Sequence, residues 1–289
     1  MKRSRTSQRG FTLLELIVAM VISAILAGMI AMIIGAPVDS YLQQGRNSEL
    51  SEASDRIAGT LTADFSRALP NSVRIRNVGV RSVVQMLEVM DVVYFVPQGP
   101  DPAQAPVQLD TAVADSSFSA LGSFANSDDN NVFLVVNNTV TSDVYRNVPA
   151  VRASAIVPAG TTTNPNTISL SPAFRFANGA PPTNRMFVVR RTPITYICNR
   201  GSGLLQRYAN HAIGANIPTN ESAAQLNSLG TQVTVVATGV TGCSVTCGPG
   251  PANQPCRNTL TVSMTLRSGV APQTSTVRVL HQVPVGNTP

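Results

Sequence analysis

The sequence has no tryptophan, a single lysine and few charged residues, and these absences narrow the classes of protein to which it can belong. Charged residues make up 12% and aromatic residues 5% of the 289 residues. Gly and Pro contribute 20 residues each, and the C-terminal two thirds is rich in Val, Thr, Ser, Asn and Gly. This composition is typical of β-rich, loop-rich proteins outside the cytoplasm rather than of helical enzymes.

The formal net charge of +6 gives little support to nucleic-acid binding. Four cationic side chains lie within the first nine residues, and without them the net charge is +2. The later cations are all arginine, and Arg185, Arg190 and Arg191 lie close enough in the sequence to be candidates for phosphate contacts. Because strand flanks commonly carry such solvated charges, we do not expect nucleic acid to be a partner.

Catalytic motifs are also missing from the chain. No Walker loop, HExxH or GxSxG sequence occurs. The polar run SDDNN at 127–131 has calcium-ligand residue types, but five polar residues are more typical of a solvated turn. We therefore predict that the protein is not an enzyme and has no cofactor.

The four cysteines all lie in the C-terminal third, at Cys198, Cys243, Cys247 and Cys256. Their even number, beyond a long apolar segment, predicts disulfides in an oxidising compartment. Four cysteines allow three pairings, and the sequence alone does not choose among them. Their spacing fits no common zinc site and only two histidines are present, so we predict no metal site.

The N-terminal segment RGFTLLELIVAM places a carboxylate, Glu15, inside an apolar run. The run covers 11–34 and, as a helix, is about 36 Å long, which is enough to cross a bilayer core of about 30 Å. A charge at bilayer depth costs about 2.5–3.5 kcal/mol or more, so a lone acid there indicates a partner and a function. A signal anchor with a stray acid is the alternative.

The order of the N-terminal features differs from that of a secretory signal peptide. Residues 1–10 are short, basic and polar, and the best cleavage position, between Gly10 and Phe11, precedes the apolar run. Cleavage there keeps the apolar helix in the mature protein. The basic leader predicts a cytoplasmic N-terminus, with the bulk of the chain on the other side of the membrane.

This segment resembles the class III signal of type IV pilins and type II secretion pseudopilins. The resemblance implies that prepilin peptidase cuts after Gly10 and N-methylates Phe11. It further implies that Glu15 pairs with the N-terminal amine of a neighbouring subunit during filament assembly. The implied partners are this peptidase, other major and minor pilin subunits and an inner-membrane assembly platform. The implied location is the bacterial inner membrane, with a single pass and a periplasmic body, and then a filament at the cell surface.

Helical spacing continues beyond the apolar run. We expect a transmembrane and assembly helix over 11–36, a kink at Pro37, and an amphipathic helix over 37–70 that ends at Pro70-Asn71. Packing of its apolar stripe on a sheet is favoured over a surface for a partner helix. The stripe consists of Leu42, Leu50, Ala53, Ile57, Leu61, Phe65 and Ala68.

The remainder, 71–289, is predicted to be a β-rich globular body. Alternation is clearest in NTLTVSMTL, whereas 97–131 and 158–166 are each predicted to be a long loop or a small insertion. The fold class is α+β, with a long helix packed on an antiparallel sheet as in the pilin roll. The predicted strands are 72–75, 92–96, 132–136, 167–170, 185–190, 195–198, 203–208, 232–237, 258–266 and 276–285.

Several segments resemble the MshO minor pilins of mannose-sensitive haemagglutinin (MSHA) pilus systems. They are VDSYLQQGRNSELSEASDRIAGTLTADFSRALPNSVRI, ITYICN with the nearby LLQRYA, then GCSV, and the final VRVLHQVPVGNTP. The resemblance covers roughly 1–76 and 194–289 and leaves the middle unmatched. It implies a disulfide between Cys198 and Cys243, which leaves Cys247 and Cys256, a departure from the family, to close a small loop.

The function expected from these features is that of a minor pilin in the initiation or assembly of a type IV pilus of the MSHA type. The alternatives are a minor pseudopilin of type II secretion and a pilus-tip adhesin or DNA-binding pilin. The chain is larger than a typical major pilin, which favours a low-copy position near the filament tip.

Overall fold

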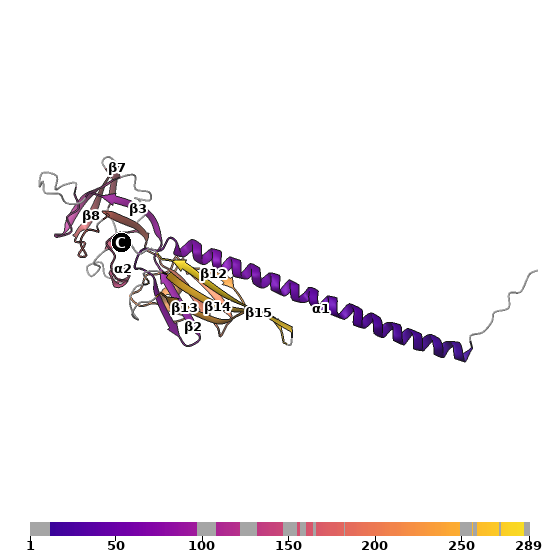
Figure 1. Ribbon diagram of the computed structural model, residues 1–289. Helices are drawn as coiled ribbons and strands as arrows, with labels where there is room; N and C mark the ends of the chain where they lie inside the picture. Colours follow the sequence, from indigo (N-terminus) through magenta and orange to yellow (C-terminus); the bar gives the residue numbers. More distant parts are fainter. Residues whose placement is uncertain are drawn as a thin grey trace, which may run out of the picture.

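The computed structural model describes residues 12–96, 108–121, 132–146, 155–156, 160–163, 166–181, 183–248, 256, 259–271 and 273–285. A long N-terminal helix projects from a β-rich body, and the β-strands lie around and beyond its C-terminal end (Figure 1). The predicted α+β class, with the helix packed on antiparallel sheets, is confirmed.

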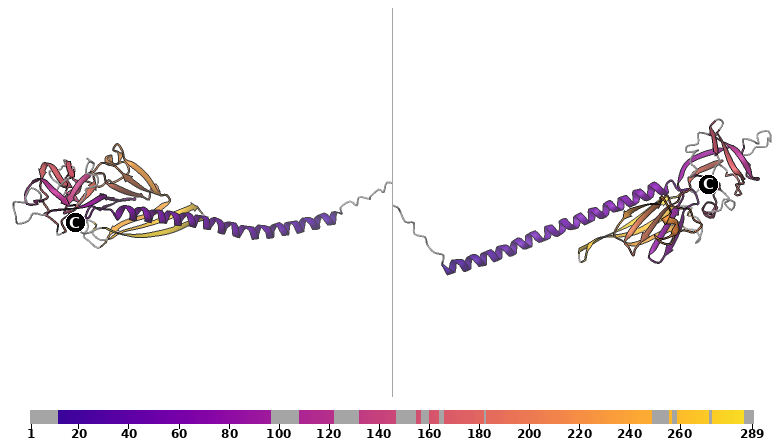
Figure 2. Two further views of the ribbon diagram at one scale, coloured as in Figure 1. Left: turned by 90° about the horizontal axis from the view of Figure 1, so that it is seen from above. Right: turned by 180° about the vertical axis from the view of Figure 1, so that it is seen from behind.

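Helix α1 runs from Leu13 to Phe65 as one element of 53 residues. It continues through Pro37 without a break, so the segments expected over 11–36 and 37–70 lie in one continuous helix. A proline removes only one backbone hydrogen bond, and the helix can continue on either side of the gap. The ribbon curves gently along its length (Figure 2); a local kink at Pro37 stays a prediction.

The end of α1 also differs from the prediction. The helix stops at Phe65 rather than at Pro70, with Ser66 as its C-cap. The Leu69 N–H donates to the carbonyl of Leu87, and the Val89 N–H donates to the carbonyl of Arg67. These bonds to a distant segment replace the next helical turn, which local sequence could not reveal.

Two antiparallel sheets face each other beside the C-terminal half of α1. One has the strand order β1-β2-β10-β11-β12 and the other β13-β14-β15. Their strands are β1 (Arg74–Val78), β2 (Arg81–Met86), β10 (Ile194–Asn199), β11 (Leu204–Ala209), β12 (Gln232–Ala237), β13 (Val240–Cys247), β14 (Thr259–Val270) and β15 (Gln273–Pro284). A short 3-10 helix, Ala224–Asn227, precedes β12.

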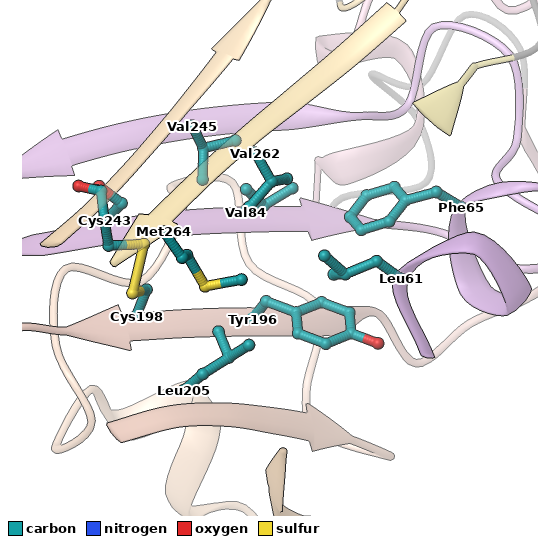
Figure 3. A pocket seen from close by; sticks show the side chains of 11 residues that line it. Leu61, Phe65, Val84, Tyr196, Cys198, Leu205, Cys243, Val245, Val262 and Met264 are labelled. Atoms are coloured by element: carbon teal, nitrogen blue, oxygen red, sulfur yellow. A yellow bond between two sulfur atoms is a disulfide. The ribbon is translucent and has the colours of Figure 1, made fainter. Parts of the chain in front are cut away.

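The apolar stripe of α1 fills the space between these sheets. Leu61 and Phe65 point into a core that receives Tyr196 from β10 and Met264 from β14 (Figure 3). Leu50, Ile57 and Ala68 are buried with them, and Ala53 packs at the edge. Leu42 is the exception, because its side chain is 47% exposed on the part of the helix that precedes the core.

Two disulfides lie in or against this core. Cys198 on β10 is bonded to Cys243 on β13, which joins the two sheets, and both side chains lie in the core seen in Figure 3. Cys247 is bonded to Cys256, nine residues later in the chain. This is the pairing that the family resemblance implied.

A third sheet forms an insertion between β2 and β10. Its strand order is β6-β5-β9-β3-β4-β8-β7. It lies beyond the C-terminal end of α1 in all views (Figures 1 and 2). The elements are β3 (Val89–Phe95), β4 (Asp115–Leu121), β5 (Val132–Val136), helix α2 (Ser142–Tyr145), β6 (Ala155–Ile156), β7 (Gly160–Thr163), β8 (Asn166–Phe174) and β9 (Arg185–Arg190).

The insertion has a core of its own and a second apolar face that docks on the rest of the body. Phe118, Leu134 and Val188 belong to the separate core. Phe133 and Phe187 face the opposite way and pack with residues next to the end of α1 and β2, including Leu69 and Leu87. Strands β4 and β7 lie within 97–131 and 158–166, so each segment contributes a strand to the insertion rather than forming a loop alone.

The two disulfides are expected to differ in their contribution to stability. The Cys198–Cys243 bond spans 45 residues and the Cys247–Cys256 bond spans nine. In the chain-entropy description, their removal by paired Cys→Ala substitutions lowers the free energy of unfolding by about 4 and about 2.5 kcal/mol. Urea unfolding of the detergent-solubilised chain, followed by circular dichroism, measures both losses. An equal or larger loss for the Cys247–Cys256 pair would contradict the prediction.

Candidate assembly site

The first turn of α1 is built by Thr12 and Glu15. Thr12 is the N-cap, with extended backbone angles, and its hydroxyl accepts a hydrogen bond of 3.3 Å from the backbone N–H of Glu15. The spacing Thr12-x-x-Glu15 is that of a capping box, a signal that was visible in the sequence. An acid in the first turn also suits the positive end of the helix dipole.

The Glu15 side chain is exposed and makes no hydrogen bond or ion pair with any residue that the structure describes. Gly10 and Phe11, the predicted cleavage and methylation positions, lie outside the described residues. The structure therefore places Glu15 one turn into a helix whose first part protrudes from the body. A carboxylate in an apolar surrounding favours a cationic partner, because pairing offsets the cost of its burial.

No part of the described protein covers the N-terminal part of α1. The segment Leu13–Ile30 has a mean hydropathy of 2.6, and none of it is buried. By length and composition it can cross a membrane. Large side chains such as Leu13 and Met20 are 78% and 64% exposed, so this half of the helix needs lipid or other helices around it.

The comparisons with known proteins match this same segment. A family model described as the prokaryotic N-terminal methylation motif matches residues 5–31. The motif indicates a prepilin of the type IV pilin and pseudopilin family. Members of that family are structural subunits rather than enzymes, are processed by prepilin peptidase and assemble with other pilins. The exposed apolar helix with its separate body is consistent with an inner-membrane prepilin. Neither the curated proteins nor the solved structures gave a match to the chain.

The C-terminal half of α1 is fixed to the body by a buried carboxylate, Asp64. Its side chain is 6% exposed and accepts hydrogen bonds from the Tyr196 hydroxyl and from Nε and Nη2 of Arg207, the latter two at 2.6 and 3.2 Å. Burial, and then the Asp64 charge, raises the pKa of Tyr196, so its phenol stays protonated and donates. The hydrogen bond to Asp64 raises the pKa of Arg207. Asp64 thus ties α1 to β10 and β11.

A second ion-pair group joins the helix end to the insertion. Glu88, in the link between β2 and β3, pairs with Arg67 at 2.9 Å and with Arg190 at 3.2 Å. Arg67 also lies 3.8 Å from Asp64. The two acids and three arginines therefore form one continuous cluster at the point where α1, the core sheets and the insertion meet.

The sequence candidates for phosphate binding do not converge. Arg190 is held by Glu88, while the guanidinium groups of Arg185 and Arg191 lie over the rings of Phe187 and Phe133. Arg185 and Arg190 also stand at opposite ends of β9. The SDDNN run at 127–131 lies outside the described residues.

Removal of the Asp64 charge is expected to loosen the body from α1. Asp64→Asn leaves Arg207 without its ionic partner, and we expect a loss of about 2–3 kcal/mol in the free energy of unfolding. The matched control is Asp39→Asn, on the exposed part of the same helix, with an expected change below about 0.5 kcal/mol. Urea unfolding of both variants tests this. Equal midpoints for Asp64→Asn and the wild type would refute the anchoring role.

Proposed function

We propose that the chain is a minor pilin that takes part in the initiation or assembly of a type IV pilus of the MSHA type, and that it resembles the MshO subunits. The observation that carries the proposal is the methylation motif at 5–31, followed at once by an apolar helix that the described protein leaves uncovered. A helix of this kind is stable either in a bilayer or in the helical core of a filament.

In this proposal the subunit waits in the inner membrane with its body in the periplasm. Prepilin peptidase cuts between Gly10 and Phe11, and Phe11 is methylated. Glu15 then pairs with the N-terminal amine of a neighbouring subunit, which selects one register of helix against helix. The bonds of Asp64 to Tyr196 and Arg207 hold the body in a fixed position on the helix as it leaves the membrane.

A low-copy position near the filament tip is part of the proposal. The insertion adds a sheet beyond the C-terminal end of α1, on the side of the body away from the membrane-length segment (Figure 1). Such an addition occupies space along the direction in which further subunits stack. Repetition along a filament shaft would require room for this sheet at every subunit, whereas a place at or near the tip requires it once.

Processing is tested by the intact mass of the membrane-extracted protein, with and without prepilin peptidase. We expect the mass of residues 11–289 plus one methyl group when the peptidase is present, and the mass of 1–289 when it is absent. Reduction should add the mass of about four protons, two for each disulfide. A chain that stays uncut under both conditions would overturn the prepilin proposal and favour a simple signal anchor.

Assembly is tested by Glu15→Gln, which removes the charge and keeps the shape of the side chain. We expect this variant to be processed but absent from sheared pili, whereas the wild type is present at far lower copy than the major subunit. Glu52→Gln, an exposed position on the same helix, is the matched control and should behave as wild type.

Normal incorporation of Glu15→Gln would show that the carboxylate does not direct assembly. A processed wild-type protein that never enters surface pili, and whose deletion blocks protein secretion, would favour the pseudopilin alternative over the pilus.

A further inference from the structure

A polar cleft of about 210 Å³ lies where the core sheet and the insertion meet, next to the ion-pair cluster at the end of α1. Its walls come from three places: Glu88 and Arg190 from the insertion and its link, Arg207 from β11, and Gln232 from β12. Asn210 and Thr192 complete the polar rim, and Ile194 and Ala209 add an apolar patch. Neither the pilin signal nor the assembly helix accounts for this feature.

The walls carry more hydrogen-bond donors than acceptors. Arg190 uses only its Nε on Glu88, and Arg207 uses Nε and Nη2 on Asp64, so both Nη atoms of Arg190 and Nη1 of Arg207 have no partner among the described residues. The acidic oxygens are already taken, because Glu88 accepts from Arg67 and Arg190. A ligand that accepts hydrogen bonds is therefore favoured over one that donates them.

The charge balance favours a single negative charge on the ligand. The ion-pair cluster around the cleft contains Arg67, Arg190 and Arg207 but only Asp64 and Glu88, which leaves one positive charge. A carboxylate is a monoanion whose two oxygens match the fork of a guanidinium. The existing bonds to Glu88 and Asp64 hold the two arginines in place, so little conformational entropy is lost on binding.

We propose that this cleft binds a sugar acid, a small polyhydroxylated ring that carries one carboxylate. The carboxylate meets Arg190 and Arg207, the amides of Asn210 and Gln232 face the hydroxyl groups, and the patch of Ile194 and Ala209 lies against the C–H face of the ring. The volume suits a single ring. The ligand contacts both the insertion and the core sheet, and the proposal does not depend on filament assembly.

The test is isothermal titration of the full chain in detergent with D-glucuronate, D-glucose, acetate and inorganic phosphate. We expect saturable binding of glucuronate, and binding at least about tenfold weaker for the other three probes, which lack either the charge or the hydroxylated ring. Gln232→Glu adds a negative charge to an exposed edge position of the cleft and should weaken glucuronate binding by about tenfold or more. Arg190→Lys keeps the charge but removes the fork and should also weaken binding.

Gln282→Glu is the matched control, because Gln282 is exposed on β15 and does not line the cleft. It should bind glucuronate as the wild type does, and near-ultraviolet circular dichroism checks that every variant is folded. No saturable binding of glucuronate up to about 10 mM would overturn the proposal. So would equal binding by a folded Gln232→Glu variant, or acetate or phosphate binding as tight as that of glucuronate, which would indicate an unspecific anion site.

Discussion

The burial of one face of α1 between two sheets is the interaction on which the rest of the molecule depends. Leu50, Ile57, Leu61 and Phe65 contribute four large side chains to that core, each worth roughly 1.5–3 kcal/mol of burial. The same helix leaves its first half without any cover from the described protein. The body is therefore organised around a helix whose C-terminal half is buried in a protein core, whereas its N-terminal half needs lipid or neighbouring helices around it. Asp64 is buried in this interface, and its hydrogen bonds with Tyr196 and Arg207 fix the position of the helix on the sheet.

The parts of the fold that could be predicted are those that depend on local patterns of apolar residues. The stripe from Leu50 to Ala68 emerged from its helical spacing, and the strands at 132–136, 185–190 and 232–237 lie where they were predicted. Strand β2 was missed because RSVVQM carries polar residues, and Gln85 is buried only because Arg74 and Thr195 bond to its side chain. Strand β13 was also missed. The helix end at Phe65 depends on pairing with residues near Leu87, a contact that no local pattern records.

The candidate site divides in the same way. Gly10, Phe11 and Glu15 follow from a short contiguous motif, so they were accessible from the sequence. The cluster of Asp64, Glu88 and Arg207 was not, because its members are far apart in the chain and meet only once the sheets have formed. The disulfide pairing was open on residue count alone and came from family resemblance. The capping role of Thr12 could also have been predicted, because the spacing Thr12-x-x-Glu15 is typical of a helix N-terminus.

The insertion between β2 and β10 also imposes an order in time on the synthesis of the chain. Met86 and Ile194 are direct partners across neighbouring strands, yet more than a hundred residues separate them. During synthesis, β1 and β2 emerge with an apolar face that has no partner until the whole third sheet has followed. That sheet has its own core and can collapse first, whereas the sheet under α1 must wait for β10. Newly made chains therefore pass through a stage in which α1 is complete but the sheet that packs on it still lacks its later strands.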